Sequence, residues 1–280
     1  DNEGRYAEVA RQMQQTGDWI TPRLDDTLFL NKPPLAYWLT GAAFALFGRN
    51  EWARLVSVLA VGGGVFATAR LGALLYGEAT GLLTALFAAS TFGLILEART
   101  LRPDALLIAS VTTALLCWAH AARADRDRRM RWLIGLYVAL GLGVLAKGLV
   151  PVILVAPVIA WSTWSDGGWA GVRRLRPLLG LAIFVALVLP WHVAVAWRHD
   201  GFAWDYVVNQ HLLFFVDRKL PRDSAGDPLW FFWAAFGLRA LPWILLAPLA
   251  GFRGHGLPWL WIAVVLGFFS LAPSRLEHYG

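Results

Sequence analysis

Long apolar runs dominate this sequence after residue 50 and limit what it can fold into. A helix needs about 20 apolar residues to cross the hydrocarbon core of a bilayer. The hydrophobic share of 58% and the 16 tryptophans also exceed what a soluble domain contains. We therefore predict an all-α integral membrane protein. The expected spans are roughly residues 52–76, 79–97, 105–122, 132–146, 149–164, 177–197, 229–250 and 257–272. The apolar segment at residues 35–47 is too short to cross, and we expect it to form a juxtamembrane or re-entrant helix.

Lys147 and Gly148 interrupt a run of apolar residues that is too long for one span. A lysine at the middle of a bilayer costs several kcal/mol, so one uninterrupted helix through this region is disfavoured. The sequence therefore predicts a helical hairpin that turns at these two residues.

The arginines show which way the chain crosses the membrane. They gather in loops at 123–131 and 173–176 and at Arg253, and alternating the expected spans puts all three on one side. The positive-inside rule makes that side cytoplasmic. The net charge of +6 is thus explained by topology, and nucleic acid is not an expected partner. The opposite, outer side receives residues 1–34, 99–104, Lys147, 198–228 and 274–279.

The amino-terminal residues predict an amphipathic helix. Tyr6, Val9 and Met13 recur at helical spacing, with charged residues on the other face. This pattern is typical of a juxtamembrane helix that lies on the membrane surface. Asp1 and Glu3 would stand at the positive end of the helix dipole, which favours their ionised forms.

The charged residues on the outer side also have purely structural explanations. Asp1 and Glu3 could act as solvated capping residues, and Asp104 could do no more than start a helix. Lys32 could extend its ammonium group to the lipid headgroups. Lys147 is different, because nothing structural requires a lysine in so long an apolar stretch.

Several short motifs occur in an order found in one family. They are residues 1–8 (DNEGRYAE), 17–24 (GDWITPRL), 32–38 (KPPLAYW), 102–104 (RPD), 146–148 (AKG), 190–191 (PW) and 274–276 (SRL). The chain resembles polyprenyl-phosphate-sugar glycosyltransferases of the GT-C class, among them the bacterial lipid A aminoarabinose transferases and the wider protein-mannosyltransferase-like superfamily. The resemblance implies a multi-span GT-C-like helical bundle with an outer amphipathic helix. Members of this family extend beyond both ends of the chain, so residues 1–280 are expected to be a single transmembrane core truncated at both ends, with 1–34 as the outer juxtamembrane segment and 35–280 as spans and loops.

The resemblance also implies an activity. The enzyme would move a sugar from an undecaprenyl-phosphate carrier to a lipid such as lipid A, a glycan or a protein, on the outer face of the bacterial inner membrane, with inversion at the anomeric carbon. The family's catalytic aspartate falls at Asn2 and its following glutamate at Glu3. Either Asp1 or Glu3 is therefore the expected catalytic carboxylate, with Asp104 as a second one.

Further residues correspond to positions that bind the carrier or a metal in the family. Lys32 matches the lysine that contacts the carrier phosphate, and Arg5 and Tyr279 are additional matches. His211 matches a histidine that holds zinc together with a glutamate, but Asn31 occupies the glutamate position. A divalent metal ion therefore stays open as a cofactor. Lys147 and Arg275 are expected to add positive charge at the substrate.

Two other classes of protein fit part of this pattern. A secondary transporter or lipid flippase would also have many spans and charges within the membrane, but it usually has repeated halves, which this sequence lacks. An inactive membrane scaffold would use the acidic amino-terminal helix only for capping. Detection of transferred sugar would distinguish an enzyme from a transporter or flippase. Loss of folding when the charged residues are changed would support the scaffold.

Overall fold

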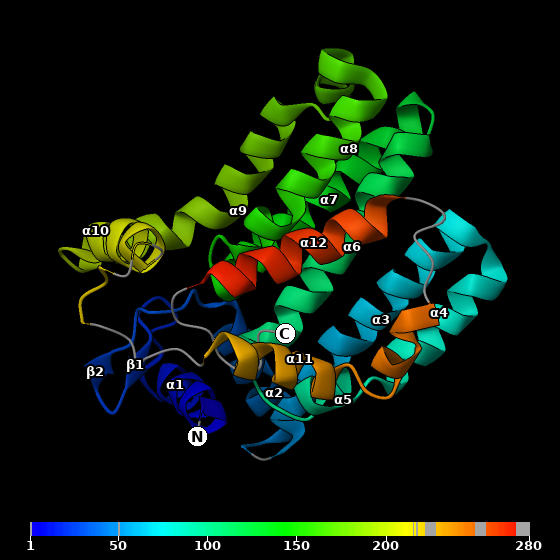
Figure 1. Ribbon diagram of the computed structural model, residues 1–280. Helices are drawn as coiled ribbons and strands as arrows, with labels where there is room; N and C mark the ends of the chain where they lie inside the picture. Colours follow the sequence, from blue (N-terminus) through cyan, green and yellow to red (C-terminus); the bar gives the residue numbers. More distant parts are fainter. Residues whose placement is uncertain are drawn as a thin grey trace.

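The computed structural model describes residues 2–49, 51–214, 216, 218–221, 228–249 and 256–272. Within these residues, five helices are long and apolar enough to cross a membrane. Four of them follow one another closely along the chain (Figure 1). The first is Glu51–Tyr76, which consists of the short helix η1 (Glu51–Arg54) and α3 (Leu55–Tyr76). The other four are α6 (Pro103–Arg123), α7 (Arg126–Lys147), α8 (Val150–Arg174) and α9 (Pro177–Arg198).

Two expected spans are bent rather than straight. Helix α4 (Glu78–Ser90) meets α5 (Phe92–Ala98) at 64°, and α11 (Leu229–Arg239) meets η3 (Trp243–Leu249) at 99°. The expected spans over 79–97 and 229–250 are thus each formed by a bent pair of helices, and each pair taken together is apolar enough to cross a membrane. The expected span at 257–272 forms α12 (Gly256–Leu271), which is shorter than the spanning helices.

The two bends hold each other through contacts at their breaks. The backbone N–H of Phe92 donates to the carbonyl of Leu241 at 2.9 Å. The Trp243 indole stacks on Phe87 with ring centroids 4.0 Å apart and donates to the Ser90 hydroxyl at 3.0 Å. These bonds satisfy polar groups that a broken helix exposes, so each break stabilises the other.

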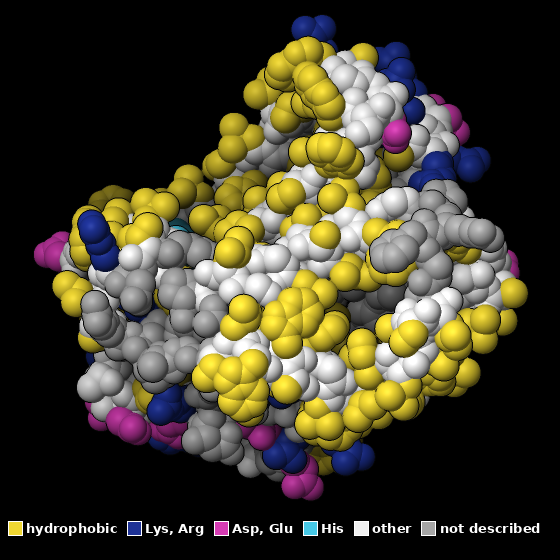
Figure 2. Space-filling view, viewed as in Figure 1, with side chains coloured by type: hydrophobic (Ala, Val, Ile, Leu, Met, Phe, Trp, Pro, Cys, Tyr) yellow, Lys and Arg dark blue, Asp and Glu magenta, His cyan; other side chains and the backbone are white. Residues whose placement is uncertain are grey.

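Helix α6 is the central helix of the bundle. It packs against α3 on one side and α7 on the other, and two-thirds of its apolar window is buried. Small residues allow the close approach: a Cβ added to Gly64 of α3 would lie only 3.0 Å from Ile108 of α6. Figure 2 shows hydrophobic side chains over the middle of the bundle and arginines at the end where α8 meets α9, as expected for a helical bundle that crosses a bilayer.

The outer segment is a small layer of its own. It contains α1 (Asn2–Thr16), an antiparallel pair formed by β1 (Arg23–Leu24) and β2 (Thr27–Leu28), and α2 (Leu35–Phe47). The prediction of an amphipathic first helix is confirmed. However, its apolar residues Val9 and Met13 are buried against Tyr37 of α2, so protein covers this face and not the membrane surface as expected.

Helix α9 connects this layer to the bundle. The Trp191 indole donates to the carbonyl of Ile20 at 2.9 Å. Near the end of α9, Arg198 pairs with Asp18 at 2.9 Å. The chain then continues into α10 (Phe202–Trp204) and the π-helix η2 (Asp205–Leu213), which lie beside the outer layer in Figure 1.

Candidate active site

A buried ion pair between Asp104 and Lys147 lies at the centre of the site. Pro103 begins α6 and its missing N–H suits the first turn, which places Asp104 at the helix start. Lys147 is the last residue of α7, and the predicted hairpin follows it directly. The Lys147 ammonium contacts Asp104 Oδ1, and the two side chains are only 7% and 13% exposed. Burying either charge alone would be costly, and the pairing offsets that cost.

His211 lies against the hairpin turn that directly follows Lys147. Gly148 has a φ of +72°, and a Cβ added there would lie 2.9 Å from His211 Nε2. The Nδ1–H of His211 donates to the carbonyl of Tyr206 at 2.5 Å. Burial lowers the pKa of His211, and the nearby positive charge of Lys32 lowers it further. The imidazole is therefore neutral at pH 7, with the Nε2 lone pair towards the turn.

Tyr206 adds a hydroxyl group at the same turn. A Cβ on Gly148 would lie 3.2 Å from its oxygen. Among the residues that the structure describes, this buried hydroxyl has no hydrogen-bond partner. An unpaired buried hydroxyl is unfavourable, so a ligand group that hydrogen bonds to it would bind with a gain in free energy. The sequence motifs gave no signal for this residue.

Glu3 approaches the site from α1. Its carboxylate accepts a hydrogen bond from Arg54 at 2.6 Å and one from the backbone N–H of Leu101 at 3.4 Å. The bond from Arg54 holds the pKa of Glu3 below its usual value, although partial burial opposes this shift. Glu3 is thus ionised at neutral pH. Its bond to Leu101 places it near Asp104, which follows Leu101 by three residues.

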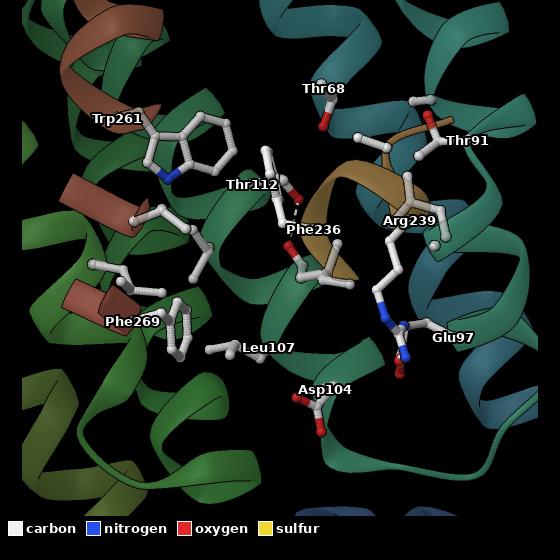
Figure 3. Close-up of a pocket in the computed structure, with 18 residues that line it drawn as sticks. Thr68, Thr91, Glu97, Asp104, Leu107, Thr112, Phe236, Arg239, Trp261 and Phe269 are labelled. Atoms are coloured by element: carbon white, nitrogen blue, oxygen red, sulfur yellow. Dashed lines mark hydrogen bonds and ion pairs between the residues drawn. The ribbon is translucent and has the colours of Figure 1, made fainter. Parts of the chain in front are cut away.

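Glu97 is a functional candidate that the motifs missed. It is 5% exposed and lies close to two arginines, 3.6 Å from Arg102 and 3.4 Å from Arg239. Figure 3 shows Glu97 beside the guanidinium of Arg239, on the side of a cavity that also holds Asp104. The signal in the sequence was a carboxylate at the end of an expected span, where charged residues are rare and usually functional.

The remaining predicted site residues do not all join this cluster. Arg5 is exposed on α1, and no ion pair to it is present in the described part of the chain. Asn31, at the position of a metal-binding glutamate in the resembling family, is also exposed. Across the described ranges, no group of three metal-binding side chains surrounds His211 or any other residue, so no step is assigned to a metal. Asp1, Arg275 and Tyr279 lie outside the described residues.

The arrangement can place carboxylates and cations around one substrate. Glu3 bonds to Leu101, three residues before Asp104 of the ion pair. The turn after Lys147 lies against His211, which is close enough to Lys32 to feel its charge. Ionised carboxylates can accept or orient a proton, and lysines can stabilise a phosphate. The fold and this site define a multi-pass membrane protein with a charged centre at one end of its bundle.

Comparison with known proteins places this chain in a family. A family model described as dolichyl-phosphate-mannose-protein mannosyltransferase matches residues 31–194. The chain belongs to this family.

Individual relatives agree with that assignment. An undecaprenyl phosphate-alpha-4-amino-4-deoxy-L-arabinose arabinosyl transferase of Pseudomonas paraeruginosa is 32% identical over 264 residues, which cover 89% of this chain and 45% of the relative. A similarly named transferase 2 of Pseudomonas fluorescens is 27% identical, covering 99% of this chain and 49% of its own. The chain therefore spans about half the length of the curated relatives it matches.

A solved structure shares the whole fold. The crystal structure of ArnT from Cupriavidus metallidurans bound to undecaprenyl phosphate superimposes with a TM-score of 0.89 at 25% identity. The match covers 100% of this chain and 52% of the other. The expected GT-C-like helical bundle is thereby confirmed.

Proposed function

We propose that this chain carries the catalytic core of a glycosyltransferase that moves a sugar from an undecaprenyl-phosphate carrier to an acceptor on the outer face of the bacterial inner membrane. The observation that carries the proposal is the buried Asp104–Lys147 pair, which continues into the turn that lies against His211, a residue within reach of the charge of Lys32. The acceptor would be a lipid resembling lipid A, or a glycan or protein.

The reaction requires a base and a cation on opposite sides of the sugar. An acceptor oxygen attacks the anomeric carbon, its proton passes to a carboxylate, and the bond to the carrier phosphate breaks with its electron pair left on the phosphate. Glu3 is ionised and suits the proton acceptor, and Asp1 stays an alternative. Asp104 would orient the acceptor. Lys32 would stabilise the charge that develops on the departing phosphate.

The test is transfer of radiolabelled sugar from undecaprenyl-phosphate donors in membranes with equal amounts of each protein. Lys32→Ala and Glu3→Gln are expected to lower the rate at least about a hundredfold, since charge stabilisation and proton transfer each contribute that much. Arg126→Ala is the matched control, because Arg126 is an exposed cation at the first residue of α7, at the opposite end of this helix from Lys147. Its rate should equal that of the unchanged protein.

The opposite result would reject the enzyme. If no carrier-linked sugar is transferred while the protein is folded, and the protein instead moves lipid or solute across the membrane, the chain belongs to a transporter. If Lys32→Ala retains full activity, the carrier phosphate binds elsewhere.

A further inference from the structure

A small charged pocket lies at the far end of the bundle from the candidate active site. It has a volume of about 100 Å³ and is formed by α6, α7 and α8, at the end where Figure 2 shows arginines. Its charged lining residues are Arg129 of α7 and Asp166 and Arg174 of α8. Pockets that enclose a whole small molecule measure roughly 300–1,000 Å³. The volume therefore suits one polar head group rather than an entire ligand.

The pocket lies at the level of the cytoplasmic head groups. Arg129 and Lys147 are 18 residues apart on α7, which corresponds to about 27 Å along a helix. This distance is close to the roughly 30 Å thickness of the hydrocarbon core. Beyond the pocket, Trp164 and Trp169 meet edge to face at 5.5 Å and are 53% and 69% exposed. Exposed tryptophans gather at membrane–water interfaces, so the pocket opens among head groups.

A break in α8 builds one wall of the pocket. Gly168 has a φ of +51° and a ψ of −138°, which interrupts the helix. A Cβ added to Gly171 would lie 2.5 Å from the carbonyl oxygen of Thr163, so the segment after the break packs directly on the segment before it. Asp166 precedes the break and Arg174 follows it, and both line the same pocket. The break thus places opposite charges around one small space.

These charges have capacity left for a ligand. Arg129 donates from Nε to the carbonyl of Ala121 at 3.2 Å and from Nη2 to that of Ala124 at 2.9 Å. These bonds anchor its guanidinium at the end of α6, while Nη1 donates to none of the described residues. Arg174 and Asp166 are exposed, and neither forms an ion pair within the described part of the chain. Two cations and one carboxylate are therefore available at this pocket.

We propose that this pocket binds the head group of a zwitterionic phospholipid of the cytoplasmic leaflet, with its phosphate at Arg129 and Arg174 and its ammonium group at Asp166. Guanidinium groups match the geometry of phosphate oxygens, and basic pockets between helices on the cytoplasmic side bind lipid head groups. The carboxylate determines which head group fits. Phosphatidylethanolamine offers an ammonium group to Asp166, whereas phosphatidylglycerol has no cation to place there. The site is separate from the sugar-transfer site and does not depend on the proposed function.

The test is native mass spectrometry of the purified full-length protein that contains this chain. The protein in detergent is given equimolar dioleoyl-phosphatidylethanolamine and dioleoyl-phosphatidylglycerol, and the first bound lipid is quantified. The ethanolamine lipid should be preferred several-fold. Arg174→Ala should weaken binding of both lipids about fivefold, because one arginine near the membrane surface contributes that much. Asp166→Asn should weaken binding of the ethanolamine lipid alone and so remove the preference.

Matched variants test the position of the site. Arg173 and Asp127 are exposed and do not line the pocket, so Arg173→Ala and Asp127→Asn should leave both affinities unchanged. Ala122 is exposed and lines the pocket, so Ala122→Trp should fill it and abolish the preference. Ala170 is exposed on α8 outside the wall, and Ala170→Trp should bind lipid normally.

Several results would overturn the proposal. These are equal binding of the two lipids by the unchanged protein, a preference that survives Asp166→Asn, or equal effects of the two tryptophan variants. Displacement of the bound lipid by millimolar inorganic phosphate would identify a soluble anion as the ligand and would also reject the lipid. The assay contains no sugar donor, so its outcome is independent of the proposed transferase activity.

Discussion

Lys147, the last residue of α7, forms a buried ion pair with Asp104 in the first turn of α6. The two residues are 43 positions apart, and the antiparallel packing of α6 and α7 brings them together. The lysine therefore provides the opposite charge for a carboxylate that is buried at the end of an apolar bundle. Without that partner the charge would have to be hydrated or lost.

Breaking this pair should destabilise the protein strongly. Asp104→Asn or Lys147→Met alone leaves one buried charge uncompensated and is expected to cost about 3–5 kcal/mol of unfolding free energy. The double variant should cost at least about 1 kcal/mol less than the sum, because the two residues interact. Denaturant unfolding in detergent measures all three.

An exposed ion pair provides the control. Arg128 pairs with Asp125 at 3.6 Å, and both side chains are largely solvent-accessible. Arg128→Ala should change stability by less than about 1 kcal/mol. Strictly additive costs for Asp104→Asn and Lys147→Met would contradict the pairing.

Glu3 predicts a pH dependence. Its pKa in the folded protein lies below 4.5, mainly because of the hydrogen bond from Arg54. A carboxylate with a lowered pKa stabilises the fold above its unfolded pKa, and this contribution is lost as pH falls through the folded value. Titration of Glu3 should therefore leave both the stability and the transfer rate unchanged from pH 7 to about 5. Both should decline at lower pH, once Glu3 becomes protonated.

Arg54→Gln tests the cause of that shift. Without the guanidinium, the pKa of Glu3 should rise towards 4.5, and the acidic limb of the rate profile should move to higher pH. Arg49→Gln is the control, because Arg49 bonds to Gln14 and not to Glu3. An unchanged limb in Arg54→Gln would show that Glu3 does not determine the profile.

Gly148 makes a specific prediction about the hairpin turn. Its φ of +72° and ψ of −153° are accessible almost only to glycine. Gly148→Ala also places a methyl group 2.9 Å from His211 Nε2, so η2 must move. We expect a loss of at least about 1–3 kcal/mol and reduced sugar transfer.

Gly77 separates the two causes. It has a φ of +98° and a ψ of 163°, and no atom lies within 4 Å of an added Cβ. Gly77→Ala should thus lower the stability through backbone strain alone and leave the transfer rate unchanged. Equal loss of transfer in both variants would mean that the contact with His211 is unimportant.

Trp191 is expected to hold the outer layer on the bundle. Trp191→Phe removes the bond to the Ile20 carbonyl and should cost about 1–2 kcal/mol. Hydrogen exchange of residues 18–22 should accelerate in this variant. Trp197, on the same helix and 87% exposed, is the matched control, and Trp197→Phe should leave exchange unchanged. Slow exchange in Trp191→Phe would show that other contacts, such as Asp18 with Arg198, suffice.

Much of the fold could be predicted because its signals are local. The length and apolarity of residues 103–123 and 177–198 identify spans without knowledge of their neighbours, since the bilayer is the common solvent for all of them. The same reasoning located the turn at Lys147. The amphipathic spacing of α1 is local too, and it correctly predicted a helix.

Only the tertiary structure determines which distant segments pack against these locally predicted helices. Hydropathy cannot show that α2 covers the apolar face of α1, or that the breaks after Ser90 and Arg239 dock on each other, because both depend on packing between distant segments. Glu97 and Arg239 are 142 positions apart, and no periodicity relates them. By itself the sequence determined a membrane-spanning helical chain and the residues able to do chemistry. Only the packing of α5, α6, α7 and α11 decided which charges meet, since a buried charge is stable only where the fold supplies its partner.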